Sequence, residues 1–518
     1  MKSARNASCI ICIALLLSAA LALAAESEDA LNAKRVEALL LSLPGRVQTS
    51  GIEVKGDSLV VRGLTSSLHM QEGKTSVRTV LRIGEIACTG VDFKAMDTPG
   101  VRRLAASIRI TGYAAKVDRL SPERKEPASS FSEKILMHSV VIRGLHGDAA
   151  ELRKALSDMQ SPTRLLRSLV SFKVDSMDME DASACLEGDG FRPLLTDVSG
   201  VTAQDFSLLH SGPVKMEGFA LEVDGRKALE IDSAGHDSLR FTELVAPLLS
   251  LDLTKSKSSI ESDALLILLD NLQELSLSME GLHISGVRTL NPEWGDNALR
   301  RIRGTLKASL SEVQLDGSVE DLKLDPRLYT SFGAQGKALA ELYGKTLYFS
   351  GGVQAAAVTR FSGGGITLHE LNAVEPNLGK VALSLKLAYS PGILALFARP
   401  DDLRVSVQEA EVQLEDKGIG DLLFALGLKE KQQVPDAGRI STARSSAAQN
   451  IRKAAADKGG KYAEAAEALA ELCARSGAVS LRLRPDTPIP LEHIKNFRPL
   501  KDLDVHYSPP SKRDAAQQ

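Results

Sequence analysis

The sequence predicts an α+β, β-rich protein, with large, mostly antiparallel twisted sheets and amphipathic helices packed on one face. Two observations lead to this fold class. Runs of alternating apolar and polar residues, the period-two signature of half-buried strands, recur along most of the chain. A glycine interrupts many of these runs just before their last apolar residue. We therefore expect sheets built from repeated strand-Gly-strand units, with helical apolar spacing in the segments between them.

Residues 275–287 (LSLSMEGLHISGV) show the repeated unit most clearly. The apolar residues of 275–279 alternate with polar ones, but Leu282 and Ile284 are out of phase with them. A flat strand would put these two groups on opposite faces of the sheet. One extra residue next to Gly281, as a β-bulge or as a tight reversal, returns both groups to one face, and glycine has the backbone freedom for either.

The same pattern, apolar-x-apolar-x-Gly-apolar, occurs at irregular intervals, so the chain is not a solenoid of fixed period. Its copies are Leu59/Val61/Gly63/Leu64, Ile86/Cys88/Gly90/Val91, Ile108/Ile110/Gly112/Tyr113, Val140/Ile142/Gly144/Leu145 and Val214/Met216/Gly218/Phe219. Looser copies are Phe172/Val174/Ser176/Met177, Thr196/Val198/Gly200/Val201 and Val313/Leu315/Gly317. Such patterns are common in β proteins in general, but their number and the repeated loss of phase favour similar strands laid into large sheets.

Helical segments precede the strands in both halves of the chain. Residues 27–43 predict a helix, and Asp148 predicts the N-cap of another, with Glu151 three residues on. A further helical stretch at 241–272 leads into the strand at 275. This order predicts duplication of a helix-on-sheet unit.

The expected division of the chain follows from these segments, with a boundary near Ser256 where the composition changes. We expect a signal peptide at 1–24, an N-terminal helix-on-sheet domain at 25–256, a second copy at 257–415, a C-terminal helical insert with a closing strand at 416–507, and a disordered tail at 508–518. Near the C-terminus the patterns predict a strand at 380–389, a strand pair at 405–414, an apolar helix at 418–428, a polar linker at 429–446, an Ala-rich helical region at 451–474 broken at Gly459-Gly460, and a last strand at 479–483.

The first residues have the features of an export signal. Lys2 and Arg5 precede an apolar run at 9–23, which ends in a small-x-small cleavage site at 22–24. Cleavage removes both cations, so the formal net charge of -3 becomes -3 - 2 = -5. No later run is long and apolar enough to predict a membrane span. We expect a periplasmic protein, whose membrane contact is limited to an N-terminus left uncleaved.

Composition argues against several classes of ligand. The nearly neutral charge lacks the basic excess of a nucleic-acid binder, so no nucleic-acid partner is expected. Aromatic residues are scarce, and the single Trp, Trp294, is in the loop-like NPEWGD, which disfavours stacking grooves for sugars or single strands. After the signal, Cys88, Cys185 and Cys473 remain. They form no disulfide framework: Cys88 has the phase of a core residue, and a bridge between the other two has little support.

The C-terminal region resembles a known group of proteins. Residues 414–427 (LEDKGIGDLLFALG), the Ala-rich helix and residues 478–491 (AVSLRLRPDTPIPL) resemble the end of exported β-rich bacterial proteins. The strand-Gly-strand units resemble the AsmA-like and YdgA-like envelope proteins. This resemblance implies a role in envelope or outer-membrane lipid homeostasis, and it implies no catalytic motif.

The search for catalytic motifs predicts no catalytic, cofactor-binding or metal-binding residue, and no cofactor. HExxH, GxSxG and GxxxxGK[ST] do not occur, and 333–337 (GAQGK) lacks the spacing and the hydroxyl residue of a phosphate loop. The glycines at 363–365 are expected to form a turn. His138, His146 and His283 are expected on sheet surfaces, because a metal site needs several convergent ligands.

Three functional hypotheses of different class remain. The first is a non-catalytic envelope protein whose sheet leaves an apolar face open as a groove for lipid acyl chains. If helices fill that face, the protein is instead a periplasmic scaffold or assembly module, which could bind an envelope protein along an edge strand. The third is a hydrolase whose site is assembled from distant residues and carries no motif.

Overall fold

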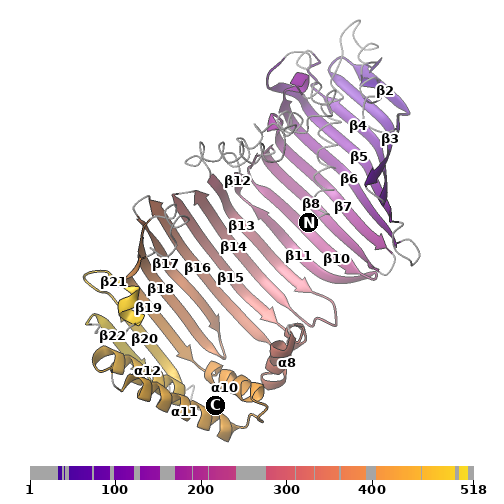
Figure 1. The fold of residues 1–518 in the computed structure, drawn as a ribbon. Helices are drawn as coiled ribbons and strands as arrows, with labels where there is room; N and C mark the ends of the chain where they lie inside the picture. The colour runs from indigo at the N-terminus through magenta and orange to yellow at the C-terminus, as the bar shows by residue number, and fades with distance from the viewer. Residues whose placement is uncertain are drawn as a thin grey trace. The chain divides into compact units, whose positions relative to one another are not determined.

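The computed structural model describes residues 33–34, 36–37, 40, 46–72, 75–93, 99–121, 129–151, 170–188, 191–207, 209–240, 276–309, 311–331, 333–360, 363–391, 404–456, 458–495 and 501–510. The chain divides into two compact units, Met1–Met279 (unit 1) and Glu280–Gln518 (unit 2). Both are built mainly from antiparallel strands, which confirms the predicted fold class (Figure 1). The expected signal peptide, the helical stretch 241–272, the boundary near Ser256 and the tail from residue 511 lie outside the described residues.

Unit 1 contains a long antiparallel meander. Strands β3 to β8, β10 and β11 pair in that order, β1 and β2 both pair with β3, and β9 pairs with β12. The strands are β1 Arg46–Gln48, β2 Gly51–Lys55, β3 Ser58–Glu72, β4 Thr75–Thr89, β5 Arg102–Ser121, β6 Ser129–Gly147, β7 Lys173–Gly188, β8 Phe191–Ser207, β9 His210–Ser211, β10 Val214–Val223, β11 Arg226–His236 and β12 Ser238–Arg240.

Unit 2 contains a second meander and most of the described helices. Strands β14 to β20 pair in chain order, β22 pairs with β20, and β21 pairs with β19. The strands are β13 Ser276–Thr289, which crosses the unit boundary, β14 Ala298–Ser309, β15 Glu312–Leu324, β16 Leu347–Arg360, β17 Gly363–Glu375, β18 Gly379–Ser390, β19 Arg404–Asp416, β20 Gly477–Leu483, β21 Ile489–Pro490 and β22 Leu503–Ser508. The helices are α7 Pro326–Tyr329, α8 Gly333–Leu342, α10 Ile419–Glu430, α11 Ala437–Ala455, α12 Gly460–Arg475 and α13 Leu491–Lys495.

The glycines of the repeated unit lie inside continuous strands. Gly112 in β5 and Gly218 in β10 have φ values of +64° and +61°, and β13 continues through Gly281 at φ +63°. The chain therefore kinks at these positions without reversing. The tight reversal is wrong, and in unit 1 the strands also keep their register across these glycines, so the expected β-bulge does not form there. Glycine adopts this left-handed region without the steric cost that other L-residues incur.

The kinks of unit 1 are aligned across the sheet. In the register of the strand pairs, each left-handed residue lies opposite a single residue of the neighbouring strand, and the register is the same on both sides of this line. We call the line the phase-reset row. It consists of Gly63, Gly84, Gly112, His138, Asp181, Ser199, Gly218 and Asp232. Left-handed φ values occur on every second strand of the row, at Gly63, Gly112, Asp181 and Gly218.

A second row of the same kind runs alongside the first. It consists of Gly90, Ala106, Gly144, Asp175 and Asp205. Left-handed φ values again occur on alternate strands, at Gly90, Gly144 and Asp205. The sequence pattern misses Asp181 and Asp205, because short polar side chains also tolerate this region and do not interrupt the alternation as glycine does.

The phase-reset row keeps the apolar side chains of unit 1 on one face. In β5, Ile108 and Ile110 are buried on one side of Gly112, and Tyr113 and Ala115 are buried on the other. An uninterrupted strand would have turned one of these pairs toward the opposite face. The core of unit 1 therefore extends across both sides of the row.

This core is densest over β3 to β6. Val36 and Leu40, from the predicted N-terminal helix, are 0% and 1% exposed and belong to the same apolar cluster as the inward residues of these strands. The described residues of 27–43 are helical, and the Glu151 amide donates to Asp148 Oδ1 at 2.9 Å, which confirms the predicted N-cap. Farther along the meander, inward residues such as Met179 are only partly buried.

Several predictions for unit 2 are corrected by the structure. Residues 405–414 form one strand, β19, with a bulge between Val407 and Ala410 in place of the expected strand pair. The glycines at 363–365 begin β17 and are not a turn: Tyr389 packs where a Cβ of Gly364 would lie, so its ring requires a glycine there. The chain also continues past β20 into β21 and β22, so the strand at 479–483 is not the last.

The expected polar linker at 429–446 is mostly helix α11, and the reason is a buried arginine. The Arg444 side chain is 6% exposed, and its guanidinium contacts Asp416 Oδ2 at 2.8 Å and Asp421 Oδ1 at 2.5 Å. It also donates to the carbonyl oxygen of Cys473 at 2.6 Å and to Ser476 Oγ at 3.0 Å. Arg444 thus joins β19, α10, α11 and the end of α12. These contacts overcome the low helix propensity of the surrounding Ser and Thr residues. The predicted break at Gly459-Gly460 is confirmed.

Replacing glycines in unit 1 should separate the cost of the kink from ordinary packing. Gly51→Ala is the control, because Gly51 has open space and no left-handed φ. Gly112→Ala should lower the free energy of unfolding by about 1–2 kcal/mol through its left-handed φ alone. Gly218→Ala should cost more, since its Cβ would lie 2.9 Å from the Ser199 Cβ. Urea denaturation measures the free energy of unfolding of each variant. Equal losses for all three variants would contradict the role of the phase-reset row.

Removing the Arg444 side chain should strongly destabilise unit 2. Arg444→Ala leaves the Asp416 carboxylate, 6% exposed, buried without its cation, and we expect a loss of about 3–5 kcal/mol. Arg439→Ala on the same helix removes an exposed pair with Asp436 and should cost at most about 1 kcal/mol. Thermal unfolding compares the two, and similar losses would show that Arg444 is not the anchor of these helices.

Candidate functional site

The sheet of unit 2 has one apolar face that runs across neighbouring strands. Leu315 on β15 lies opposite Ala355 on β16, which lies opposite Leu368 on β17, followed by Leu385 on β18 and Ala410 on β19. The rows beside it are also apolar. They are Val313, Ala357, Ile366, Leu387 and Val407 on one side, and Val353, Leu371, Leu383, Val412 and Leu481 on the other.

The middle of this face is open to solvent to an unusual degree for large apolar side chains. The exposed fractions are 40% for Leu315, 44% for Ile366, 44% for Leu371 and 42% for Val381, with 39% for Val313. We call these five exposed residues of β15, β17 and β18 the exposed apolar face. A contiguous apolar surface of this kind is uncommon on a soluble domain and usually marks a binding site.

The opposite face of the same strands is polar. Cross-strand ion pairs join Arg482 to Glu411 at 3.4 Å and Arg484 to Glu409. Gln354 on β16 donates to Asp316 on β15 at 3.3 Å. The strands therefore separate apolar from polar side chains by simple alternation, and bulges in β17 and β19 preserve that separation along their length.

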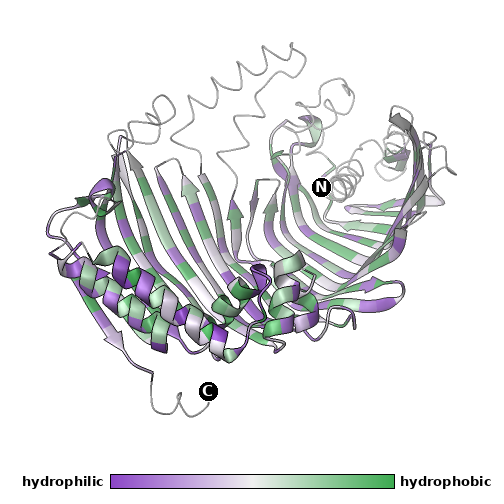
Figure 2. Cartoon of the chain, turned by 60° about the horizontal axis from the view of Figure 1, so that its bottom comes forward, coloured by the Kyte–Doolittle hydropathy of each residue, from purple (hydrophilic) through white to green (hydrophobic). Residues whose placement is uncertain are grey.

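Among the described residues, helices cover this side of the sheet in two places. α7, α8 and α10 pack on Leu324, Leu347 and Phe349 at the ends of β15 and β16, and α12 and α13 pack on the last strands. Tyr462 and Ala465 of α12, with Leu491 and Ile494 of α13, pack against a cluster that contains Val407, Leu483 and Leu503. These contacts lie over β19, β20 and β22 and include Leu385 and Leu387 of β18. Figure 2 shows the paired helices beside these strands and the alternating apolar colouring of the strands beyond them. The exposed apolar face is thus the continuation of a covered core.

The described residues contain no group of three or more His, Cys, Asp or Glu side chains that could hold a metal ion. The closest polar grouping is in unit 1, where Asp205 contacts Lys173 at 2.5 Å and His210 at 3.0 Å. These two donors lower the pKa of the Asp205 carboxyl, the lysine more strongly. The Ser207 hydroxyl bonds the backbone of His210 and not its ring, so no nucleophile is activated in this grouping.

The cysteines and histidines take the positions that their phase indicates. Cys88 is 3% exposed, and burial raises the pKa of its thiol to about 12, which makes it an unreactive core residue. Cys185 and Cys473 are also free thiols. His138 is exposed on its strand, while His146 and His283 are partly exposed.

The loop at 291–296 that contains Trp294 is held by Asn297, whose amide donates to the Trp294 carbonyl oxygen at 2.7 Å.

Within the described part of the chain, no helix combines the length and the apolar character that crossing a bilayer requires.

Comparison with family profiles, curated proteins and solved structures finds no significant match to this chain. The resemblance of residues 414–491 to AsmA-like and YdgA-like proteins accordingly stays a prediction. The sequence predicted no site residues, and the exposed apolar face is defined by strand pairing and exposure, which alternation alone does not report.

Proposed function

We propose that this chain is a non-catalytic, exported envelope protein that binds lipid acyl chains along the exposed apolar face of unit 2. The observation that carries the proposal is the exposure of large apolar side chains in adjacent rows, such as Leu371 and Val381, on strands whose other face is polar. Acyl chains have no polar groups to satisfy, so a surface without donors or acceptors matches them.

The energetic argument is simple burial. Covering apolar surface gains about 25 cal/mol per Å², so side chains left 40% or more exposed retain favourable free energy that a ligand can supply. Rows of branched aliphatic side chains offer a smooth surface to a flexible chain. The hydrophobic effect is not directional, so such a surface selects for apolar chains in general and not for one particular lipid.

Export supports the same function. The predicted signal at 1–24 would deliver the chain to the periplasm, where lipids must pass between membranes through water. The resemblance of residues 414–491 to AsmA-like proteins also points to envelope lipid homeostasis. The predicted signal and the resemblance both support the proposal.

A second candidate function is binding of an envelope protein along β22. This strand pairs with β20 on one side, and among the described residues no strand pairs with its other side. A free strand edge is a template for a partner strand. A photo-crosslinking residue in place of Asp504 should then give a discrete adduct in cells, whereas the same residue in place of Asp316, on an inner strand, should not.

Lipid extraction and mass spectrometry of the purified protein test the acyl-chain proposal. The double variant Leu371→Asp, Val381→Asp should reduce bound lipid about tenfold or more, because each buried aliphatic contact contributes roughly 1.5–3 kcal/mol. Both positions are already exposed, so the variant should remain folded.

The matched control is Leu136→Asp, an apolar residue 52% exposed on the polar face of unit 1, which should leave the bound lipid unchanged. A wild-type protein that carries no lipid, and gains none from vesicles, would overturn the proposal. Equal losses in the control and the double variant would show that the exposed apolar face is not the binding surface.

A further inference from the structure

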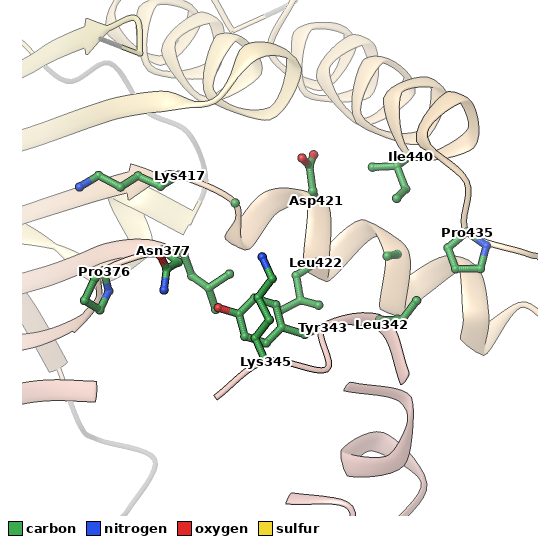
Figure 3. Close-up of a pocket in the computed structure, with 13 residues that line it drawn as sticks. Leu342, Tyr343, Lys345, Pro376, Asn377, Lys417, Asp421, Leu422, Pro435 and Ile440 are labelled. Carbon is green, nitrogen blue, oxygen red and sulfur yellow. The ribbon is translucent and has the colours of Figure 1, made fainter. Parts of the chain in front are cut away.

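A separate cavity of about 550 Å³ lies in unit 2 where α8, α10 and the start of α11 meet the turn between β17 and β18 (Figure 3). Leu342, Leu422 and Ile440 form an apolar part of its wall, and Lys345 and Asn377 add polar groups. The volume is typical of a site for a small organic ligand, and the wall combines apolar side chains with polar groups.

Lys345 is the cation at this cavity that has no anionic partner. Among the described residues, no carboxylate lies within ion-pair distance of its Nζ; its one contact is with the Tyr343 ring, whose centroid lies 6.0 Å away. In Figure 3 the Lys345 ammonium points into the space between Asn377 and Leu422. A cation held over a ring, with no carboxylate beside it, is available to an anionic ligand.

The other charged groups at the cavity are already engaged. Asp421 pairs with Arg444 at 2.5 Å, and Lys417 pairs with Glu415 at 3.3 Å. The carboxylate of Glu375, 4% exposed, accepts the backbone amides of residues 377 and 378, each at 2.7 Å. These contacts compensate the nearby negative charges and leave the positive charge of Lys345 facing the cavity.

We propose that this cavity binds a single-chain anionic amphiphile, with its carboxylate or phosphate head at Lys345 and Asn377 and its aliphatic chain against Leu342, Leu422 and Ile440. The Lys345 ammonium matches an anionic head, and the apolar part of the wall matches an aliphatic chain, so an amphiphile matches both. None of the lining residues belongs to the exposed apolar face, so this proposal does not rest on acyl-chain binding there.

Calorimetric titration of the full chain with decanoate tests the head contact. Lys345→Glu should weaken binding at least tenfold, and Lys345→Met, which removes the charge without reversing it, should weaken it less. The matched control is Lys431→Glu, an exposed lysine that follows α10 and does not line the cavity. It should bind decanoate like the wild type. Equal weakening in Lys345→Glu and Lys431→Glu would show that the effect comes from the net charge of the protein, and it would overturn the proposal.

Further probes separate the sources of the anion and the role of the chain. Decyl phosphate should bind at least as well as decanoate, while decanol and inorganic phosphate should each bind at least tenfold more weakly. If decanol bound as tightly as decanoate, the anionic head would contribute nothing to binding. Inorganic phosphate binding as tightly as decyl phosphate would make the cavity a site for a free anion, and either result overturns it.

Photo-crosslinking locates the ligand and keeps the two proposals separate. A decanoate bearing a diazirine should label peptides 339–345 and 419–440, and Lys345→Glu should remove this labelling. Labelling of β15 to β18 reports on the exposed apolar face and should respond to Leu371→Asp, Val381→Asp instead. Absence of cavity labelling overturns this inference whether or not the strands are labelled.

Discussion

The structure of unit 1 depends on one constraint: a strand that kinks must keep its apolar side chains on the same face. A kink in a single strand would shift it against its neighbours by one residue and move its apolar residues to the wrong face. Here each left-handed residue lies opposite a single residue of the neighbouring strand, so the pairing register is the same on both sides of the row. The kink is therefore a property of the sheet and not of any single strand.

Sterics explain the residues found in these rows. A left-handed residue directs its Cβ at the neighbouring strand, so glycine is needed where that strand is close. A Cβ on Gly90 would lie 2.5 Å from the Ala106 Cβ, and one on Gly218 would lie 2.9 Å from the Ser199 Cβ. At these two positions the opposing residues, Ala106 and Ser199, are small. Alternation of left-handed residues from strand to strand avoids placing two of them face to face.

The result is an apolar face on the strands of each unit, and the functional question becomes what covers that face. Over β3 to β6 the inward side chains are buried, and over β19, β20 and β22 they lie under α12 and α13. Over β15 to β18 several of them, such as Leu315, Leu371 and Val381, are exposed. The Arg444 anchor holds the C-terminal helices at their end of the sheet, so the same contacts that stabilise these helices also bound the cavity beside α10.

The sequence by itself determined the secondary structure in outline. Period-two alternation predicted antiparallel strands, and the loss of phase predicted an irregularity at the glycines. Local signals also predicted the N-cap at Asp148, the apolar helix before Leu428 and the break at Gly459. These features depend on residues close together in the chain. Local signals failed at 429–446, where polar residues form a helix because Arg444 bonds groups far away in sequence.

Only the tertiary structure decided which residues act together. Whether the chain continues or reverses at Gly112 depends on the strands beside it, whose residues lie dozens of positions away. The cavity joins Lys345, Asn377 and Ile440 from separate segments. The exposed apolar face has the same alternation as a buried one, because a strand's pattern records which side avoids water and not whether another element covers it.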